Sequence, residues 1–133
     1  MNTNSLSDNE KLTKLFSLII KEEELSEIAE NEIISLFDSR GEKAAKILKE
    51  KKLHKLVLDE NIVLWEVEGK SKKYIIIDEN FCECTDFQVR VLGREEKTLC
   101  YHLLAKIIGE KFELHDSKGL TDKEYDKLLE SRL

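Results

Sequence analysis

Two short stretches decide the fold: Cys82-Glu83-Cys84 and, after fifteen intervening residues, Cys100-Tyr101-His102. They contain all three cysteines of the 133-residue chain. An odd number of cysteines cannot be used up by disulfides within one chain. The polar start of the chain, Met1 to Ser5, lacks the apolar run of a signal peptide, so clustered cysteines favour a metal site over a disulfide framework.

The spacing within each stretch predicts where the elements lie. Residues i and i+2 of a strand project from the same face, so Cys82 and Cys84 can both face one ion. Residues i and i+2 of a helix point about 200° apart, so Cys100 and His102 cannot both bind from a helix interior. We therefore expect Cys100 near a helix cap and His102 in the first turn. Thr98 and the apolar run after it independently predict a helix start there.

Three thiolates and one imidazole form the closed tetrahedron that is typical of structural zinc. The sequence thus predicts one Zn²⁺ ion held by Cys82, Cys84, Cys100 and His102, with metal binding coupled to the folding of residues 80–112. Because such a closed site has no position for a catalytic water, the sequence argues against an enzymatic function. The alternative is that the cysteines are small buried core residues.

The rest of the chain predicts an α+β fold. Apolar residues at helical spacing follow a capping box at Ser7–Glu10, and two more helical patterns extend from about 25 to 37 and from 39 to 52. We expect a 1–52 helical N-terminal region, then a 53–133 segment with a small antiparallel sheet, a finger at about 80–112 and a short closing helix, all in one compact unit. The expected later elements are strands at 56–58, 62–67, 74–77 and 81–84, and helices at 98–111 and from 121.

The charge of the chain limits its partners. With 22 Lys+Arg against 28 Asp+Glu, the net charge of −6 argues against a generic polyanion binder. Residues 42–55 nevertheless contain six lysines and two glutamates. This stretch is either a solvated helix face or a surface that binds nucleic acid or an acidic partner. No stretch approaches the roughly 18 apolar residues of a membrane span, so we expect a cytoplasmic protein, or a nuclear one if the source is eukaryotic.

The cysteine segment resembles a SWIM-type zinc finger, whose pattern is CxC, a variable spacer, and CxH with Ala three residues later. Here those positions are Cys82, Cys84, Cys100, His102 and Ala105. Over about residues 40–130 the chain also resembles the small SWIM subunit of the Shu complex. The abundance of Lys and Glu, with Gln88 the only glutamine, fits a thermophilic and thus an archaeal form.

This resemblance implies a non-enzymatic accessory protein without a small-molecule substrate. It would bind a RecA-family recombinase paralogue and assist DNA repair by homologous recombination. The predicted helix at 98–111 has more apolar residues than one core-facing stripe requires. Either its surplus side chains face the partner, or neighbouring elements bury them all; the candidates are Leu99, Leu103, Ile107 and Phe112.

Direct DNA binding is the alternative function, since SWIM fingers are often assigned that role. Aromatic rings for stacking on single-stranded bases are sparse near the finger. The candidate phosphate contacts are basic residues of the finger spacer and of the turn before it: Arg90, Arg94, Lys97, Lys70, Lys72 and Lys73.

Overall fold

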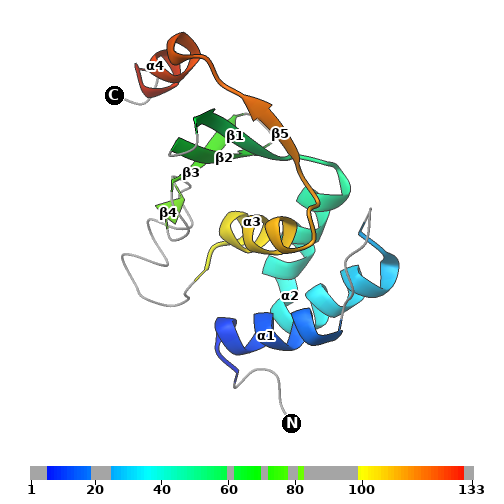
Figure 1. Ribbon diagram of the computed structural model, residues 1–133. Helices are drawn as coiled ribbons and strands as arrows, with labels where there is room; N and C mark the ends of the chain where they lie inside the picture. Colours follow the sequence, from blue (N-terminus) through cyan, green and yellow to red (C-terminus); the bar gives the residue numbers. More distant parts are fainter. Residues whose placement is uncertain are drawn as a thin grey trace.

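The computed structural model describes residues 6–18, 25–59, 62–69, 72–77, 81–82 and 99–130. The α+β prediction is confirmed, with a five-stranded sheet and four helices in this part of the chain (Figure 1). None of the described helices is long and apolar enough to cross a membrane. The elements in chain order are α1 (Asp8–Leu18), α2 (Glu27–Lys49), β1 (Leu53–Asp59), β2 (Ile62–Glu68), β3 (Lys73–Ile77), β4 (Phe81–Cys82), α3 (Tyr101–Lys111), β5 (Asp116–Gly119) and α4 (Asp122–Glu130).

The N-terminal helices begin and break where local chemistry dictates. The predicted capping box is present, because Ser7 Oγ accepts a hydrogen bond from the Glu10 N–H at 3.1 Å and donates one to the Glu10 carboxylate at 3.1 Å. The two helices predicted between 25 and 52 are the two halves of α2, which breaks at Asp38 with φ 53° and ψ −127°. The second half folds back so closely that Gly41 packs on the backbone of Ile33, which leaves no room for a Cβ.

The sheet is mixed, which corrects the prediction of an antiparallel one. Its strand order is β4-β3-β2-β1-β5, and the first four strands pair antiparallel. β5 pairs parallel to β1, with Asp116 opposite His54. The connection through α3 returns the chain to the far edge of the sheet in the same direction as β1. The sequence of β5, Asp-Ser-Lys-Gly, has none of the β-branched or aromatic residues that predict a strand.

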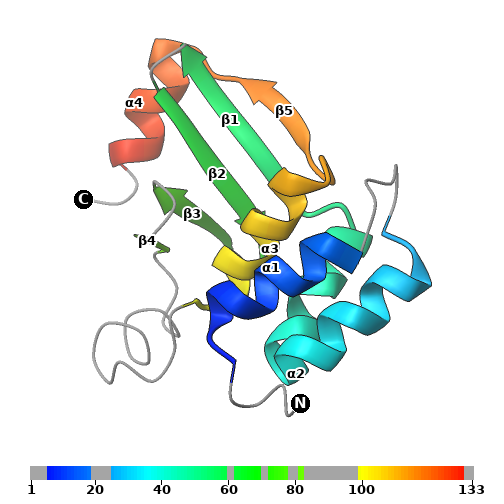
Figure 2. The same cartoon turned by 60° about the horizontal axis from the view of Figure 1, so that its bottom comes forward.

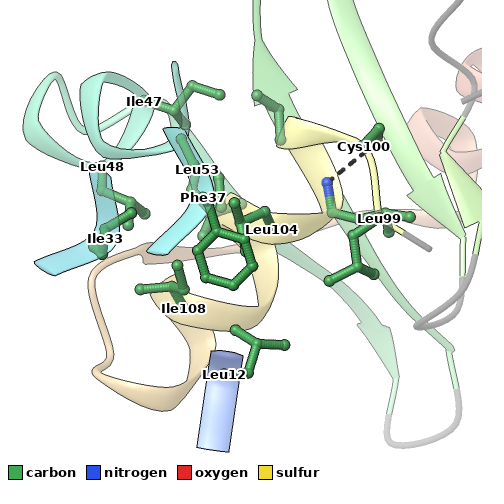
Figure 3. Packing of buried hydrophobic residues seen from close by; sticks show 14 of the residues in the cluster. Leu12, Ile33, Phe37, Ile47, Leu48, Leu53, Leu99, Cys100, Leu104 and Ile108 are labelled. Atoms are coloured by element: carbon green, nitrogen blue, oxygen red, sulfur yellow. Dashed lines mark hydrogen bonds between the residues drawn. The ribbon is translucent and has the colours of Figure 1, made fainter. Parts of the chain in front are cut away.

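The core lies between the sheet and the α1–α2 pair, with α3 in the middle (Figure 2). Leu99, which Figure 3 shows among the core side chains, is buried in this core. Leu103 and Phe112 are also buried, and Ile107 is partly buried against the core. Of the two alternatives for these side chains, burial by neighbouring elements therefore holds for Leu99, Leu103 and Phe112. Elements on both sides of α3 cover its wide apolar arc, so the surplus of apolar residues serves core packing.

Candidate metal centre

Three of the four predicted ligands meet in the described part of the chain. The donor atoms of Cys82, Cys100 and His102 all lie within 4.8 Å of one another, and all three residues are buried. Cys82 comes from β4, Cys100 is the N-cap of α3, and His102 lies in the first turn of α3. The fourth predicted ligand, Cys84, lies outside the described residues.

The start of α3 positions Cys100 as the spacing predicted. Cys100 is the N-cap, with extended φ −80° and ψ 167°, and its Sγ accepts a hydrogen bond from the Leu103 N–H at 3.4 Å (Figure 3). The positive end of the helix dipole favours negative charge on this sulfur. Because Cys100 precedes the helix and His102 lies in its first turn, both side chains reach the same point.

The sheet positions Cys82 opposite them. Cys82 pairs with Ile76 in the neighbouring strand β3, and both are fully buried members of the core beneath α3. A side chain at this register position of β4 therefore points toward the first turn of α3 rather than to solvent.

The His102 imidazole lies against two tyrosine rings. Its centroid is 4.6 Å from that of Tyr74 and 4.1 Å from that of Tyr101. The side chain is 2% exposed, yet Nδ1 has no hydrogen-bond partner among the residues that the structure describes. A buried polar atom without a partner requires an explanation, and a ring held beside two thiols offers one, since imidazole nitrogen and thiolate sulfur are zinc donors.

The spacing of the donors fits a metal ion. A tetrahedral zinc with Zn–S bonds of ~2.3 Å places neighbouring sulfurs about 3.8 Å apart. The 4.8 Å limit on the observed donor separations is about 1 Å longer, a difference that small side-chain rotations can remove. The residues present therefore fit a zinc ion that completes its shell with one further donor.

A buried polar network holds the residue before Cys100. Arg40, in the second half of α2, donates to both carboxylate oxygens of Asp8 at 2.8 and 2.9 Å and to the Leu99 carbonyl at 2.8 Å. The Leu99 N–H donates back to Asp8 at 3.2 Å. We call Asp8, Arg40 and the Leu99 backbone the Leu99 clamp. It links the starts of α1 and α3 to the middle of α2.

The electrostatics of the clamp favour the charged carboxylate. Burial by itself raises the pKa of Asp8, but the hydrogen bonds and charge of Arg40, together with the Leu99 N–H, outweigh it. The pKa of Asp8 therefore lies below its ordinary value of 3.8. This network could not be predicted from local sequence, because the residues that it joins are 32 and 59 positions apart in the chain.

The candidate DNA contacts fall into two groups. Arg90, Arg94, Lys97 and Lys70 lie outside the described residues. Lys72 is exposed, with Nζ 4.8 Å from the centre of the Tyr74 ring, and Lys73 Nζ lies 3.8 Å from the Glu66 carboxylate.

A second group of potential metal donors was missed by the sequence analysis. Donor atoms of His54, Glu66 and Glu68 lie within 4.8 Å of one another on β1 and β2. The alternation Glu66-Val67-Glu68 in a strand places both carboxylates on one face, but the partner strand that brings His54 to them is not evident from local sequence.

Comparisons of the chain with protein-family models, with curated proteins and with solved structures gave no match.

Proposed function

We propose that this chain is a zinc-finger accessory protein whose single structural Zn²⁺ is held by Cys82, Cys84, Cys100 and His102. The observation that carries the proposal is the convergence of Cys82, Cys100 and His102, three buried soft or borderline donors from two distant segments. Ordinary core packing would not bring an imidazole with a partnerless buried nitrogen to this place. With Cys84 as the fourth ligand the ion has no open position, so its role is structural and the protein is not an enzyme.

The proposed partner is a RecA-family recombinase paralogue, and the proposed process is homologous recombination repair. This part of the proposal depends on the resemblance of residues 82–105 to a SWIM finger and of residues 40–130 to the small Shu-complex subunit. The burial of Leu99, Leu103 and Phe112 limits the docking surface. The partner must bind elsewhere than the core-facing side of α3.

Zinc analysis and affinity purification of the same sample test both parts. We expect the tagged wild-type protein to carry zinc and to retain a RecA-like protein from extract of its native cells. The variant His102→Ala should lose about one equivalent of zinc relative to wild type and should lose the partner. His115→Ala is the matched control, because His115 is only partly buried at the end of the α3–β5 connection, packs against Trp65 and lies outside the ligand pattern.

The two parts of the proposal can fail separately. Equal zinc content in wild type and His102→Ala would overturn the metal assignment. A zinc-loaded wild-type protein that enriches no RecA-like protein would overturn the partner assignment and leave the zinc finger standing.

Direct DNA binding is the second candidate function. The observation that favours it is Lys72, an exposed cation over the Tyr74 ring next to the metal centre, which pairs a phosphate contact with an aromatic platform. Phosphate contacts would make the affinity fall steeply with salt. If the isolated protein does not bind single- or double-stranded DNA at low salt, this function is excluded.

A further inference from the structure

A cluster of one imidazole and three carboxylates lies on the face of the sheet opposite α3. Trp65 and Val67 of β2 point into the core beneath α3, so the alternating residues Glu66 and Glu68 project from the other face. His54 lies directly opposite Glu66 in the antiparallel β1–β2 pair and so shares that face. Asp116 extends the same row onto β5, where it pairs with His54.

The imidazole of His54 is oriented by Asp116. Its Nδ1 lies 2.5 Å from Asp116 Oδ1. An ionised carboxylate only accepts hydrogen bonds, so Nδ1 is the donor in this contact, and Nε2 is the nitrogen left to offer a lone pair to a metal ion. A carboxylate that holds one ring nitrogen of a histidine is the arrangement that commonly supports a metal-ligating imidazole.

The other nitrogen is placed for a ligand. His54 Nε2 is buried and has no hydrogen-bond partner among the described residues. Its neighbour Glu68 Oε1 lies 3.6 Å away, too far for a hydrogen bond. Two donors on a tetrahedral zinc, with bonds of about 2.1 Å each, lie about 3.4 Å apart. The observed gap is thus close to the width that a shared ion would fill.

The negative charge of the cluster also favours the binding of a cation. The carboxylates of Glu66, Glu68 and Asp116 surround the imidazole of His54, and the Glu66 side chain is only 15% exposed. Among the described residues, one lysine contacts this cluster: Lys73 Nζ lies 3.8 Å from the Glu66 carboxylate. Lys73 is 59% exposed, so solvent weakens its compensation of the charge.

We propose that His54, Glu66 and Glu68 form a second metal site, which takes a divalent first-row transition ion of the zinc class. His54 Nε2 and one oxygen from each glutamate are the ligands, and Asp116 orients the imidazole. The imidazole donor favours zinc over Mg²⁺ or Ca²⁺, which prefer all-oxygen shells. Three protein ligands leave a fourth position for water, so the ion here exchanges more readily than one enclosed by thiolates.

Metal content of the full-length protein tests the site. After equilibrium dialysis against free Zn²⁺, we expect wild type to hold one equivalent more than His54→Gln, with binding at this site weakened at least tenfold in the variant. Glu68→Gln, at a 39% exposed position, should show the same loss, which guards against misfolding of one variant. Glu27→Gln is the matched control, since it removes an exposed carboxylate at the start of α2 and should leave the metal content unchanged.

Co²⁺ separates this site from the cysteine centre. Sulfur ligands give an intense near-ultraviolet charge-transfer band, which oxygen and nitrogen ligands do not. In His54→Gln that band should be unchanged while the bound Co²⁺ falls by one equivalent. The proposal is overturned if folded His54→Gln and Glu68→Gln bind as much metal as wild type. That result would leave a carboxylate-bound imidazolium as the explanation of the cluster.

Discussion

Removal of the Asp8 charge should destabilise the protein far more than removal of an ordinary surface charge. In Asp8→Asn the Leu99 N–H keeps an acceptor, but the Arg40 guanidinium loses the carboxylate that it holds with two hydrogen bonds. Arg40 cannot turn fully to water, because its side chain is 17% exposed. It would be left partly buried without its counter-ion.

The structure bounds the size of the effect. Breaking a fully buried ion pair costs about 3–5 kcal/mol, and an exposed pair contributes about 0–1 kcal/mol. Asp8 is 8% exposed and Arg40 17%, and the bidentate geometry is good, so the pair lies nearer the buried limit. We expect Asp8→Asn to lower the free energy of unfolding by about 2–3 kcal/mol, within those two limits.

A double-mutant cycle in urea, on zinc-saturated protein at pH 7, measures the interaction itself. Asp8→Asn, Arg40→Met and the double variant should give a coupling energy of about 2 kcal/mol. The pair Glu30–Lys49 is the matched control, with its lysine 52% exposed, and should couple by less than about 0.5 kcal/mol. If the two pairs coupled equally, the Leu99 clamp would be no stronger than a surface ion pair, and this account of it would be refuted.

Three further predictions concern acid, packing and capping. Folding lowers the pKa of Asp8, so the ionised carboxylate stabilises the folded state above the unfolded pKa near 3.9, and this stabilisation is lost as the pH falls below that value. The difference in unfolding free energy between wild type and Asp8→Asn should therefore narrow below about pH 4, and a constant difference would contradict this account. Gly41→Ala should lower the free energy of unfolding in urea by at least about 1 kcal/mol in spite of the better helix propensity of alanine, since the Cβ would lie 2.9 Å from the carbonyl carbon of Ile33; a stabilised variant would contradict the close approach. Thr121→Ala removes the hydroxyl that accepts from the Glu124 N–H, while the bond from the Thr121 N–H to the Glu124 carboxylate can remain. The loss should speed amide exchange in the first turn of α4 by about tenfold, with little change in global stability, because α4 has no fully buried residue.

Features encoded by neighbouring residues could be predicted from the sequence. The capping boxes at Ser7 and Thr121 involve groups three residues apart, so their partners are visible in the sequence. The placement of Cys100 at a helix start followed from helix geometry alone, since no regular helix brings residues i and i+2 to one point.

Features that depend on pairing between distant strands could not be predicted. Strand β5 contacts β1 through backbone hydrogen bonds, and its side chains give no strand signal. The outer cluster around His54 requires the register of three strands at once. Whether Leu103 is buried in the core or faces a partner depends on which elements cover the two sides of α3. Apolar periodicity shows the width of a buried arc but not which elements bury it.

The two donor clusters lie on opposite faces of one sheet, and their chemistry matches their surroundings. The sulfur-containing cluster is enclosed by the core, where a metal ion would be protected from exchange and its binding energy would contribute to folding. The carboxylate cluster is only half-buried, so water can reach an ion there.

The pairing of the strands relates the positions of the two clusters. Cys82 of β4 pairs with Ile76 of β3, and Ile76 pairs with Trp65 of β2. Glu66 is the next residue after Trp65, so its side chain projects from the other face of the sheet. A substitution at Glu66 therefore alters a side chain that points away from Cys82. The two proposed sites can be removed one at a time, and of the two only loss of the cysteine centre should weaken the docking of α3 on the sheet.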